Sequence, residues 1–161
     1  GVICQHWANV GTLGMSMKIN VFLSFPGSSP GSFPGSFPGT CEEALQFHQE
    51  VLGGELLPMR YYEGSPAESN APPGWEKKVM HGALETGDIH LMGSDLGPDR
   101  FEAPRGVHLS VNTDSTGEAE RIFGALADGR SVTMPLDEVF RASRFGMLTD
   151  RYGIHWMVNC V

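Results

Sequence analysis

The side chains best suited to chemistry in this sequence are histidines in strand-forming segments. Two of these histidines begin alternating trios: His108, Ser110 and Asn112 in one segment, and His155, Met157 and Asn159 in another. Because side chains alternate between the two faces of a β-strand, each trio is expected to share one face. If both faces border one cleft, two imidazoles, two amides and a hydroxyl converge there. We therefore take these six residues as candidate ligand-binding residues.

A second candidate site combines His81 with Glu85, which fall on the same face of another strand-like segment. A histidine and a carboxylate in that arrangement can act as general base and orienting partner. This makes His81, Glu85 and His108 the candidate catalytic residues. The simpler alternative for each histidine is a hydrogen-bonded role in the structure.

Three further residues are candidates for ligand binding because of their type. Arg141 comes just before a strand-like segment, and a guanidinium at a cleft mouth can hold a carboxylate or a phosphonate. Phe22 offers apolar surface on the first strand-like segment, and Trp75 lies within the long polar segment 61–78. Loops of that length are lids, interface arms or disordered, so Trp75 is expected either to line a cleft or to anchor a surface loop.

These residues must be positioned by two helices and eight strands. Apolar residues at helical spacing predict helices that begin after Thr40 and Ser115. Both starts have the pattern of a capping box, with Glu43 and Glu118 three residues later. Glycines at 53 or 54 and at 129 are expected to end the helices. The strands are expected over 18–25, 55–62, 77–85, 88–94, 106–112, 130–137, 144–150 and 154–161.

The order of these elements is a βαβββ unit written twice, so the predicted fold class is α+β with two modules in tandem. Module one spans 17–95 and module two spans 104–161 of one domain, 17–161. Short matches support the duplication, because 21–25 resembles 107–111 and 89–92 resembles 154–157. The FPGS-like repeat is then an insertion at 25–36 in one loop, which costs little closure entropy. Residues 1–16 have no clear period and are treated as an N-terminal extension.

The chain resembles the PhnB-like branch of the vicinal oxygen chelate superfamily, whose wider relatives include glyoxalase I, bleomycin resistance proteins and ring-cleaving dioxygenases. The resemblance covers about residues 17–161. It rests on "FPGTCEEALQFHQEVLGGE", "PPGWEKKVMHGALETGDIHLMGSD", "GVHLSVNTDSTGEAERIFGALADG" and "RFGMLTDRYGIHWMVNC". It implies curved mixed sheets around a cleft and a homodimer. Members are sometimes labelled 3-demethylubiquinone methyltransferases, yet no glycine-rich loop after a strand is found here that would hold adenosylmethionine.

The metal-dependent relatives hold a divalent ion with a His on the first strand of a module and a Glu on its last strand. The aligned positions here hold Phe22 and His108 on the first strands, and Met92 and Met157 on the last strands. A thioether is a poor ligand for a hard divalent ion. We therefore expect no metal cofactor, with His108 as the one weak candidate ligand. The alternative is a divalent metal held by His108 with partners such as His155 and Glu85.

Composition narrows the classes of partner. The net charge of −8 and the lack of a basic stripe argue against nucleic acid. No apolar stretch approaches the roughly 20 residues that span a bilayer, and three cysteines without CxxC spacing favour free thiols over a disulfide framework or a zinc site. We expect a cytoplasmic protein without nucleic-acid or membrane partners. The acidic charge favours a cationic guest.

Three hypotheses about function stay open. In the first, a homodimer binds a small molecule in its cleft without a metal and without chemical change. In the second, the chain is a metal-dependent lyase, isomerase or dioxygenase of the vicinal oxygen chelate type. In the third, the chain is a structural or regulatory dimer module whose cleft is closed by Trp and Met side chains.

Overall fold

The computed structural model describes residues 19–27, 40–71, 73–97, 99–128 and 131–161. The predicted extension at 1–16 and residues 28–36 of the predicted insertion lie outside this part of the chain. Phe25 is the last residue of the first strand and only 1% exposed, and Gly27 is buried as well. Phe25 therefore belongs to the core, and the insertion at 25–36 stays a prediction.

Two βαβββ modules form, which confirms the predicted fold class. The strand order is β1-β5-β4-β2 in module one, where β3 also pairs with β4, and β6-β9-β8-β7 in module two. The first strand of each module runs parallel to the last strand, and the other pairs are antiparallel, so both sheets are mixed.

The elements of module one are β1 (Val21–Phe25), α1 (Cys41–Leu52), β2 (Glu55–Leu56), β3 (Arg60–Tyr61), the 3-10 helix η1 (Glu68–Asn70), β4 (Val79–Thr86) and β5 (Ile89–Asp95). Those of module two are β6 (Leu109–Thr113), α2 (Thr116–Ala127), β7 (Ser131–Val139), β8 (Ala142–Thr149) and β9 (His155–Cys160).

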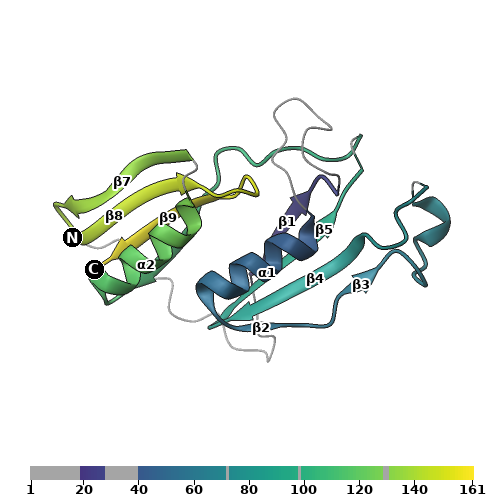
Figure 1. The fold of residues 1–161 in the computed structure, drawn as a ribbon, viewed down its shortest axis with the longest axis horizontal. Coiled ribbons are helices and arrows are strands. Elements are labelled where there is room, and N and C mark those ends of the chain that lie inside the picture. The colour runs from purple at the N-terminus through teal and green to yellow at the C-terminus, as the bar shows by residue number, and fades with distance from the viewer. Residues whose placement is uncertain (1–18, 28–39, 72, 98, 129–130) are drawn as a thin grey trace, which may run out of the picture.

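Both helices lie on the same side of the two sheets (Figure 1), with α1 packed on β4 and α2 packed on β8. Strand alternation then separates the side chains of β1. Leu23 and Phe25 are buried in the core, whereas Phe22 points to the other side and is 51% exposed. We call the sheet face away from the helix the open face of each module. No helix among the described residues is long and apolar enough to cross a membrane.

The two helix starts differ although both carry the capping-box pattern. In α1 the box is complete, since Thr40 Oγ1 accepts from the Glu43 N–H at 3.4 Å and Glu43 Oε2 accepts from the Thr40 N–H at 2.9 Å. In α2 only half of it forms: Ser115 accepts from the Glu118 N–H, but the Glu118 carboxylate binds Arg121 instead. The prediction of a second reciprocal box is therefore wrong, because an ion pair one turn along the helix captures the carboxylate.

The helix ends also differ from each other. Gly53 closes α1 with a positive φ of 74°, as predicted. In α2 the C-terminal residue Asp128 is left-handed, with φ 35° and ψ 46°, and the predicted Gly129 lies outside the described residues. Asp tolerates this conformation better than most residues, and its carboxylate forms an ion pair with Arg151.

The segment 55–62 was predicted to be one strand. In the structure it forms two strands of two residues each, β2 and β3. Pro58 lies between them, and a proline has no N–H to donate to a strand ladder. The structure thus contains nine strands in its described part. The division places the 57–59 connection alongside β4, where it borders a pocket considered below.

The pairing registers correct the internal alignment. In module one Val21 lies opposite Leu91, and in module two Leu109 lies opposite Trp156. If Leu91 and Trp156 are equivalent, Val21 corresponds to Leu109, so the predicted match of 21–25 with 107–111 is shifted by two residues. The residue of module two that corresponds to Phe22 is therefore Ser110 and not His108.

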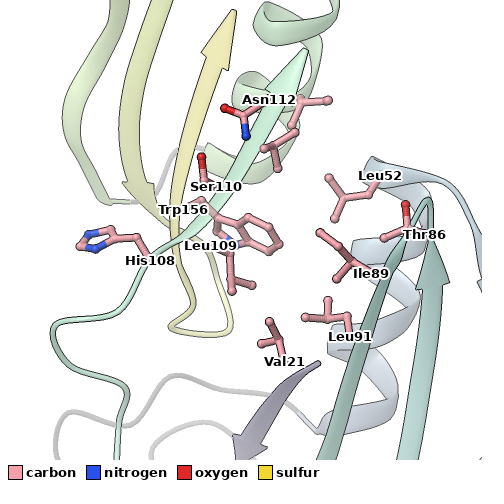
Figure 2. Close-up of a pocket in the computed structure, with 12 residues that line it drawn as sticks. Val21, Leu52, Thr86, Ile89, Leu91, His108, Leu109, Ser110, Asn112 and Trp156 are labelled. Carbon is pink, nitrogen blue, oxygen red and sulfur yellow. The ribbon is translucent and has the colours of Figure 1, made fainter. Parts of the chain in front are cut away.

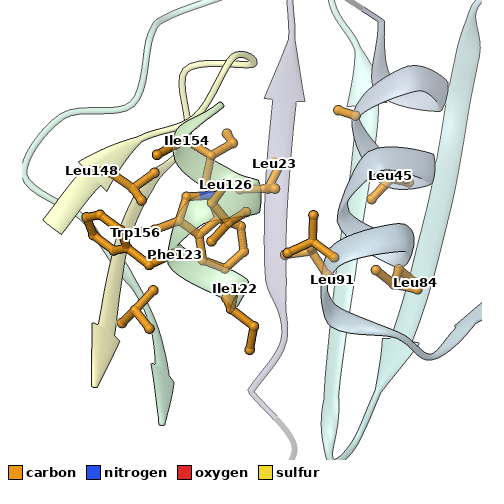
Figure 3. Packing of buried hydrophobic residues seen from close by; sticks show 14 of the residues in the cluster. Leu23, Leu45, Leu84, Leu91, Ile122, Phe123, Leu126, Leu148, Ile154 and Trp156 are labelled. Atoms are coloured by element: carbon orange, nitrogen blue, oxygen red, sulfur yellow. The ribbon is translucent and has the colours of Figure 1, made fainter. Parts of the chain in front are cut away.

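One apolar core runs through both modules. Leu23 and Leu91 of module one belong to the same buried cluster as Ile122 and Trp156 of module two, and Figure 3 shows them in the space between the two helix-covered sheets. Burying apolar surface is worth about 25 cal/mol per Å². This shared core therefore holds the modules against each other.

A buried carboxylate adds a polar connection between the modules. Asp150 follows β8, and its Oδ1 accepts from the backbone N–H groups of Tyr152 at 2.8 Å and Ile154 at 3.0 Å. Its Oδ2 bonds to Nε2 of His48 in α1 at 2.7 Å and accepts from Nε1 of Trp156 at 2.8 Å. A carboxylate only accepts, so His48 donates from Nε2. Nδ1 of His48 is buried and has no hydrogen-bond partner among the described residues.

Candidate functional site

A pocket of about 510 Å³ lies between the two modules. This volume is within the range of about 300 to 1,000 Å³ typical of small-molecule sites. Val21 and Leu109 begin β1 and β6, which are edge strands of the two sheets, and both line the pocket. We call it the inter-module pocket. Its other apolar walls are formed by Leu52, Ile89, Leu91, Val111, Ile122 and Trp156 (Figure 2).

The polar part of the inter-module pocket consists of Thr86 and three predicted residues, His108, Ser110 and Asn112. None of the described lining residues is an Asp, Glu, Lys or Arg. Figure 2 shows the His108 imidazole directed away from the module-one side chains, whereas Trp156 extends toward them. The pocket therefore joins an apolar interior to a polar rim on the module-two side.

The two predicted trios meet on the open face of module two. Ser110 lies opposite Met157, and Asn112 lies opposite Asn159, in the parallel β6–β9 ladder. Asn159 Nδ2 donates to Asn112 Oδ1 at 3.1 Å. These side chains are therefore neighbours on the open face, but His155, Met157 and Asn159 do not line the inter-module pocket. A shared ligand-binding role of the two trios stays a prediction.

The two histidines of the trios also meet, with ring centroids 5.4 Å apart. His108 was predicted to lie within a strand. In the structure it precedes β6, which begins at Leu109. His155 is held at both ring nitrogens, because Nδ1 lies 2.8 Å from Thr149 Oγ1 and Nε2 lies 3.1 Å from the Pro104 carbonyl oxygen. A carbonyl oxygen only accepts, so Nε2 carries a proton. His155 is thus arranged as a fixed hydrogen-bonded residue next to His108.

The predicted pair of His81 and Glu85 does not form. The Glu85 carboxylate lies 3.2 Å from Nδ1 of His90, its cross-strand neighbour on β5. His81 instead stacks on Phe22, with ring centroids 6.3 Å apart. Residues four apart on a strand are separated by about 13 Å, whereas cross-strand neighbours touch. This difference explains why Glu85 selects His90.

The remaining predicted residues are spread over the molecule. Phe22 and His155 line a smaller pocket of about 250 Å³ that adjoins the inter-module pocket through Val21 and Leu109. Trp75 packs edge-on against Tyr62 at 5.8 Å and against Gly27. Arg141 is exposed in the turn between β7 and β8. The binding roles of Trp75 and Arg141 stay predictions, and neither side chain borders the inter-module pocket.

Several apolar lining residues were absent from the sequence prediction, among them Val21, Ile89, Leu91 and Leu109. Their alternation in strands indicated only that they would be buried on one side. These residues line the inter-module pocket because the edge strands β1 and β6 approach each other there. No local sequence pattern encodes that approach.

The metal ligands of the superfamily do not fit the residues found here. Met92 lies opposite Phe22, and Met157 lies opposite Ser110, so neither strand pair offers a His with a carboxylate. The alternative set of metal ligands, His108 with His155 and Glu85, does not fit either. Glu85 is paired with His90, and both ring nitrogens of His155 are hydrogen-bonded. Across the described ranges, no three His, Cys, Asp or Glu side chains are grouped to hold a metal ion. That the protein has no metal cofactor stays a prediction.

Two mixed sheets built from βαβββ modules define the glyoxalase/bleomycin resistance/dioxygenase fold, to which this chain belongs. Residues 36–159 match the family described as 3-demethylubiquinone-9 3-methyltransferase, so the chain is a member of that family, the PhnB-like branch of the fold.

Known relatives agree with this assignment. Protein YjdN of Escherichia coli K12 is 30% identical over 153 residues, which cover 90% of this chain and 96% of YjdN. The crystal structure of PA1353 from Pseudomonas aeruginosa is 42% identical, with a TM-score of 0.75 over 90% of this chain and 98% of that chain. A putative 3-demethylubiquinone-9 3-methyltransferase, PhnB protein, from Bacillus cereus is 24% identical, with a TM-score of 0.71 over 90% of this chain and all of that chain, and shows the shared fold.

Proposed function

We propose that this protein binds a small, largely apolar molecule in the inter-module pocket and that no metal ion holds the ligand. The observation that carries the proposal is the pocket itself, about 510 Å³ in volume, with apolar walls from both modules and a rim of His108, Ser110 and Asn112. Apolar walls with a few convergent polar groups are what small-molecule sites need. A pocket of this size does not fit the alternative in which Trp and Met side chains close the cleft.

The methyl transfer in the family description is not part of the proposal. Dinucleotide and adenosyl sites of doubly wound proteins use a parallel sheet with a glycine-rich first turn. Here each sheet is mixed, and both helices lie on one side of the sheets. These features support a cleft protein of the glyoxalase-like type.

A neutral apolar fluorophore, N-phenyl-1-naphthylamine, is a suitable probe for the pocket. Ile89 lines the pocket and is 50% exposed, so Ile89→Arg places a charge in the apolar wall without removing a core side chain. Val161→Arg is the matched control, because Val161 is 75% exposed after β9 and lies outside the pocket. Ile89→Arg is expected to weaken binding by about tenfold or more, while Val161→Arg leaves it unchanged.

Equal affinity of the two variants for the fluorophore would overturn the assignment of the pocket. Metal dependence is tested on the same protein before and after treatment with a chelator, together with elemental analysis. Binding is expected to survive chelation unchanged. A stoichiometric divalent ion whose removal abolishes binding would instead favour the metal-dependent enzyme.

The homodimer implied by the family resemblance is also part of the proposal. Val132, Met134, Val139 and Phe140 expose apolar surface along β7 and its turn, and Phe140 is 99% exposed. Contiguous exposed apolar surface is typical of interaction sites. Light scattering after size-exclusion chromatography gives the mass that tests this expectation, and a monomer at all concentrations would contradict it.

A further inference from the structure

A third pocket, separate from the inter-module pocket, lies on the far side of module one. It has a volume of about 560 Å³ and is lined by Leu57, Pro58, Met59, Arg60, His81 and Ala83. None of these residues lines the inter-module pocket. Figure 1 shows β2 and β3 at the edge of the sheet that faces away from module two. We call this the β3-edge pocket.

The pairing register directs two nitrogen donors to the same face at this edge. Arg60 lies directly opposite His81, and the register then shifts so that Tyr61 lies opposite Val79. Tyr61 faces the helix side, since its hydroxyl donates to Glu42 of α1 at 3.4 Å. Side chains alternate along a strand, so Arg60 faces the open side, next to His81.

Apolar and aromatic groups surround this pair of donors. Leu57, Met59 and Ala83 line the same pocket. The His81 ring is stacked on Phe22, with ring centroids 6.3 Å apart and an interplanar angle of 27°. The aromatic surface beside the donors is therefore larger than the pocket lining alone, and it is suited to a flat apolar group.

The local charge at this pocket is opposite to the net charge of the chain. The whole sequence carries a net charge of −8, yet the polar lining of the β3-edge pocket consists of Arg60 and His81. Glu85, the carboxylate further along β4, is already paired with His90. Within the described ranges, Arg60 is in no ion pair. A guanidinium in this setting offers a planar pair of donors that matches a carboxylate.

We propose that the β3-edge pocket is a binding site for an aromatic or apolar carboxylate, whose anionic head is held by Arg60 and His81 and whose body lies against Leu57, Met59 and the Phe22–His81 stack. The site is independent of the inter-module pocket. It takes an anion, whereas the net charge of the chain alone favoured a cationic guest. The local arrangement decides this, because fields of surface charges are screened within about 8 to 10 Å in salt solution.

The probes for this site are 2-naphthoate and its neutral analogue 2-naphthamide, titrated into the full chain by calorimetry. The carboxylate is expected to bind about tenfold more tightly than the amide, or better. Arg60→Gln should remove this preference, and His81→Gln should reduce it. Arg100→Gln removes the same charge from an exposed residue outside the pocket and should change nothing.

The outcomes separate this site from the inter-module pocket. Ile89→Arg should leave naphthoate binding intact, and Arg60→Gln should leave binding of N-phenyl-1-naphthylamine intact. Circular dichroism checks that Arg60→Gln retains the native fold. The proposal is overturned if naphthoate does not bind, if naphthoate and naphthamide bind equally well, or if Arg60→Gln and Arg100→Gln behave alike.

Discussion

Asp150→Asn tests whether a single buried carboxylate holds the two modules together. The change keeps the shape of the side chain but replaces one carboxylate oxygen by an NH2 group, which cannot accept. Asp150 accepts from two backbone N–H groups on one oxygen and bonds to His48 and Trp156 on the other. An Asn can satisfy only one of these pairs. Hydrogen bonds to a charged group are worth about 1.5 to 3 kcal/mol each, so losing two costs about 3 to 6 kcal/mol.

This loss is large compared with the total stability of about 5 to 15 kcal/mol typical of a domain. Urea unfolding followed by tryptophan fluorescence and by circular dichroism measures it, and the two probes also show whether the modules still unfold together. Asp128→Asn is the matched control. Asp128 pairs with Arg151 at the surface, and such pairs contribute about 1 kcal/mol or less. If Asp150→Asn costs no more than Asp128→Asn, the reasoning about this inter-module connection is refuted.

Three further predictions concern module one. Thr40→Ala removes the hydroxyl that accepts from the Glu43 N–H but keeps the backbone N–H that donates to Glu43 Oε2. The loss of this side-chain cap should cost about 1 kcal/mol in urea unfolding, and no change would contradict the observed cap. Burial, together with nearby Asp95 and Glu42, raises the pKa of the Cys41 thiol far above its usual range, so this thiol should resist Ellman's reagent at pH 8 until the protein unfolds. Rapid labelling of native Cys41, located by peptide mapping, would disagree with that burial. Burial also raises the pKa of Asp95 above its ordinary value of 3.8, against the backbone hydrogen bonds from Cys41 and Val79. The protonated Asp95 carboxyl group therefore favours the folded state. This contribution to the free energy of unfolding is present below about pH 4 and is lost as the pH rises through the raised pKa. Asp95→Asn should remove this part of the pH dependence, and an unaltered profile would argue against it.

Much of the architecture could be predicted because it depends on local patterns. The start of α1 follows from Thr40 and Glu43, whose side chains reach only one turn along the chain. Alternation also placed Ser110 with Asn112 and Met157 with Asn159, and one parallel ladder aligns Ser110 with Met157 and Asn112 with Asn159. A shared binding role of these residues stays a prediction. Errors arose where a competing partner was close in space, as when Glu118 binds Arg121 instead of capping α2.

The sequence by itself determined the two βαβββ modules, since hydrophobic period, capping residues and turn glycines act over a few residues. Only the tertiary structure decided which side chains meet. It pairs Glu85 with His90 and not with His81, joins His48 of α1 to Asp150 after β8, and sets Arg60 beside His81 at a sheet edge. The physical reason is that strand register and the approach of two edge strands depend on contacts distant in the chain, and a shift of two residues keeps the same face while changing every partner. The pockets belong to this second class of features, because their walls come from elements that no local pattern brings together.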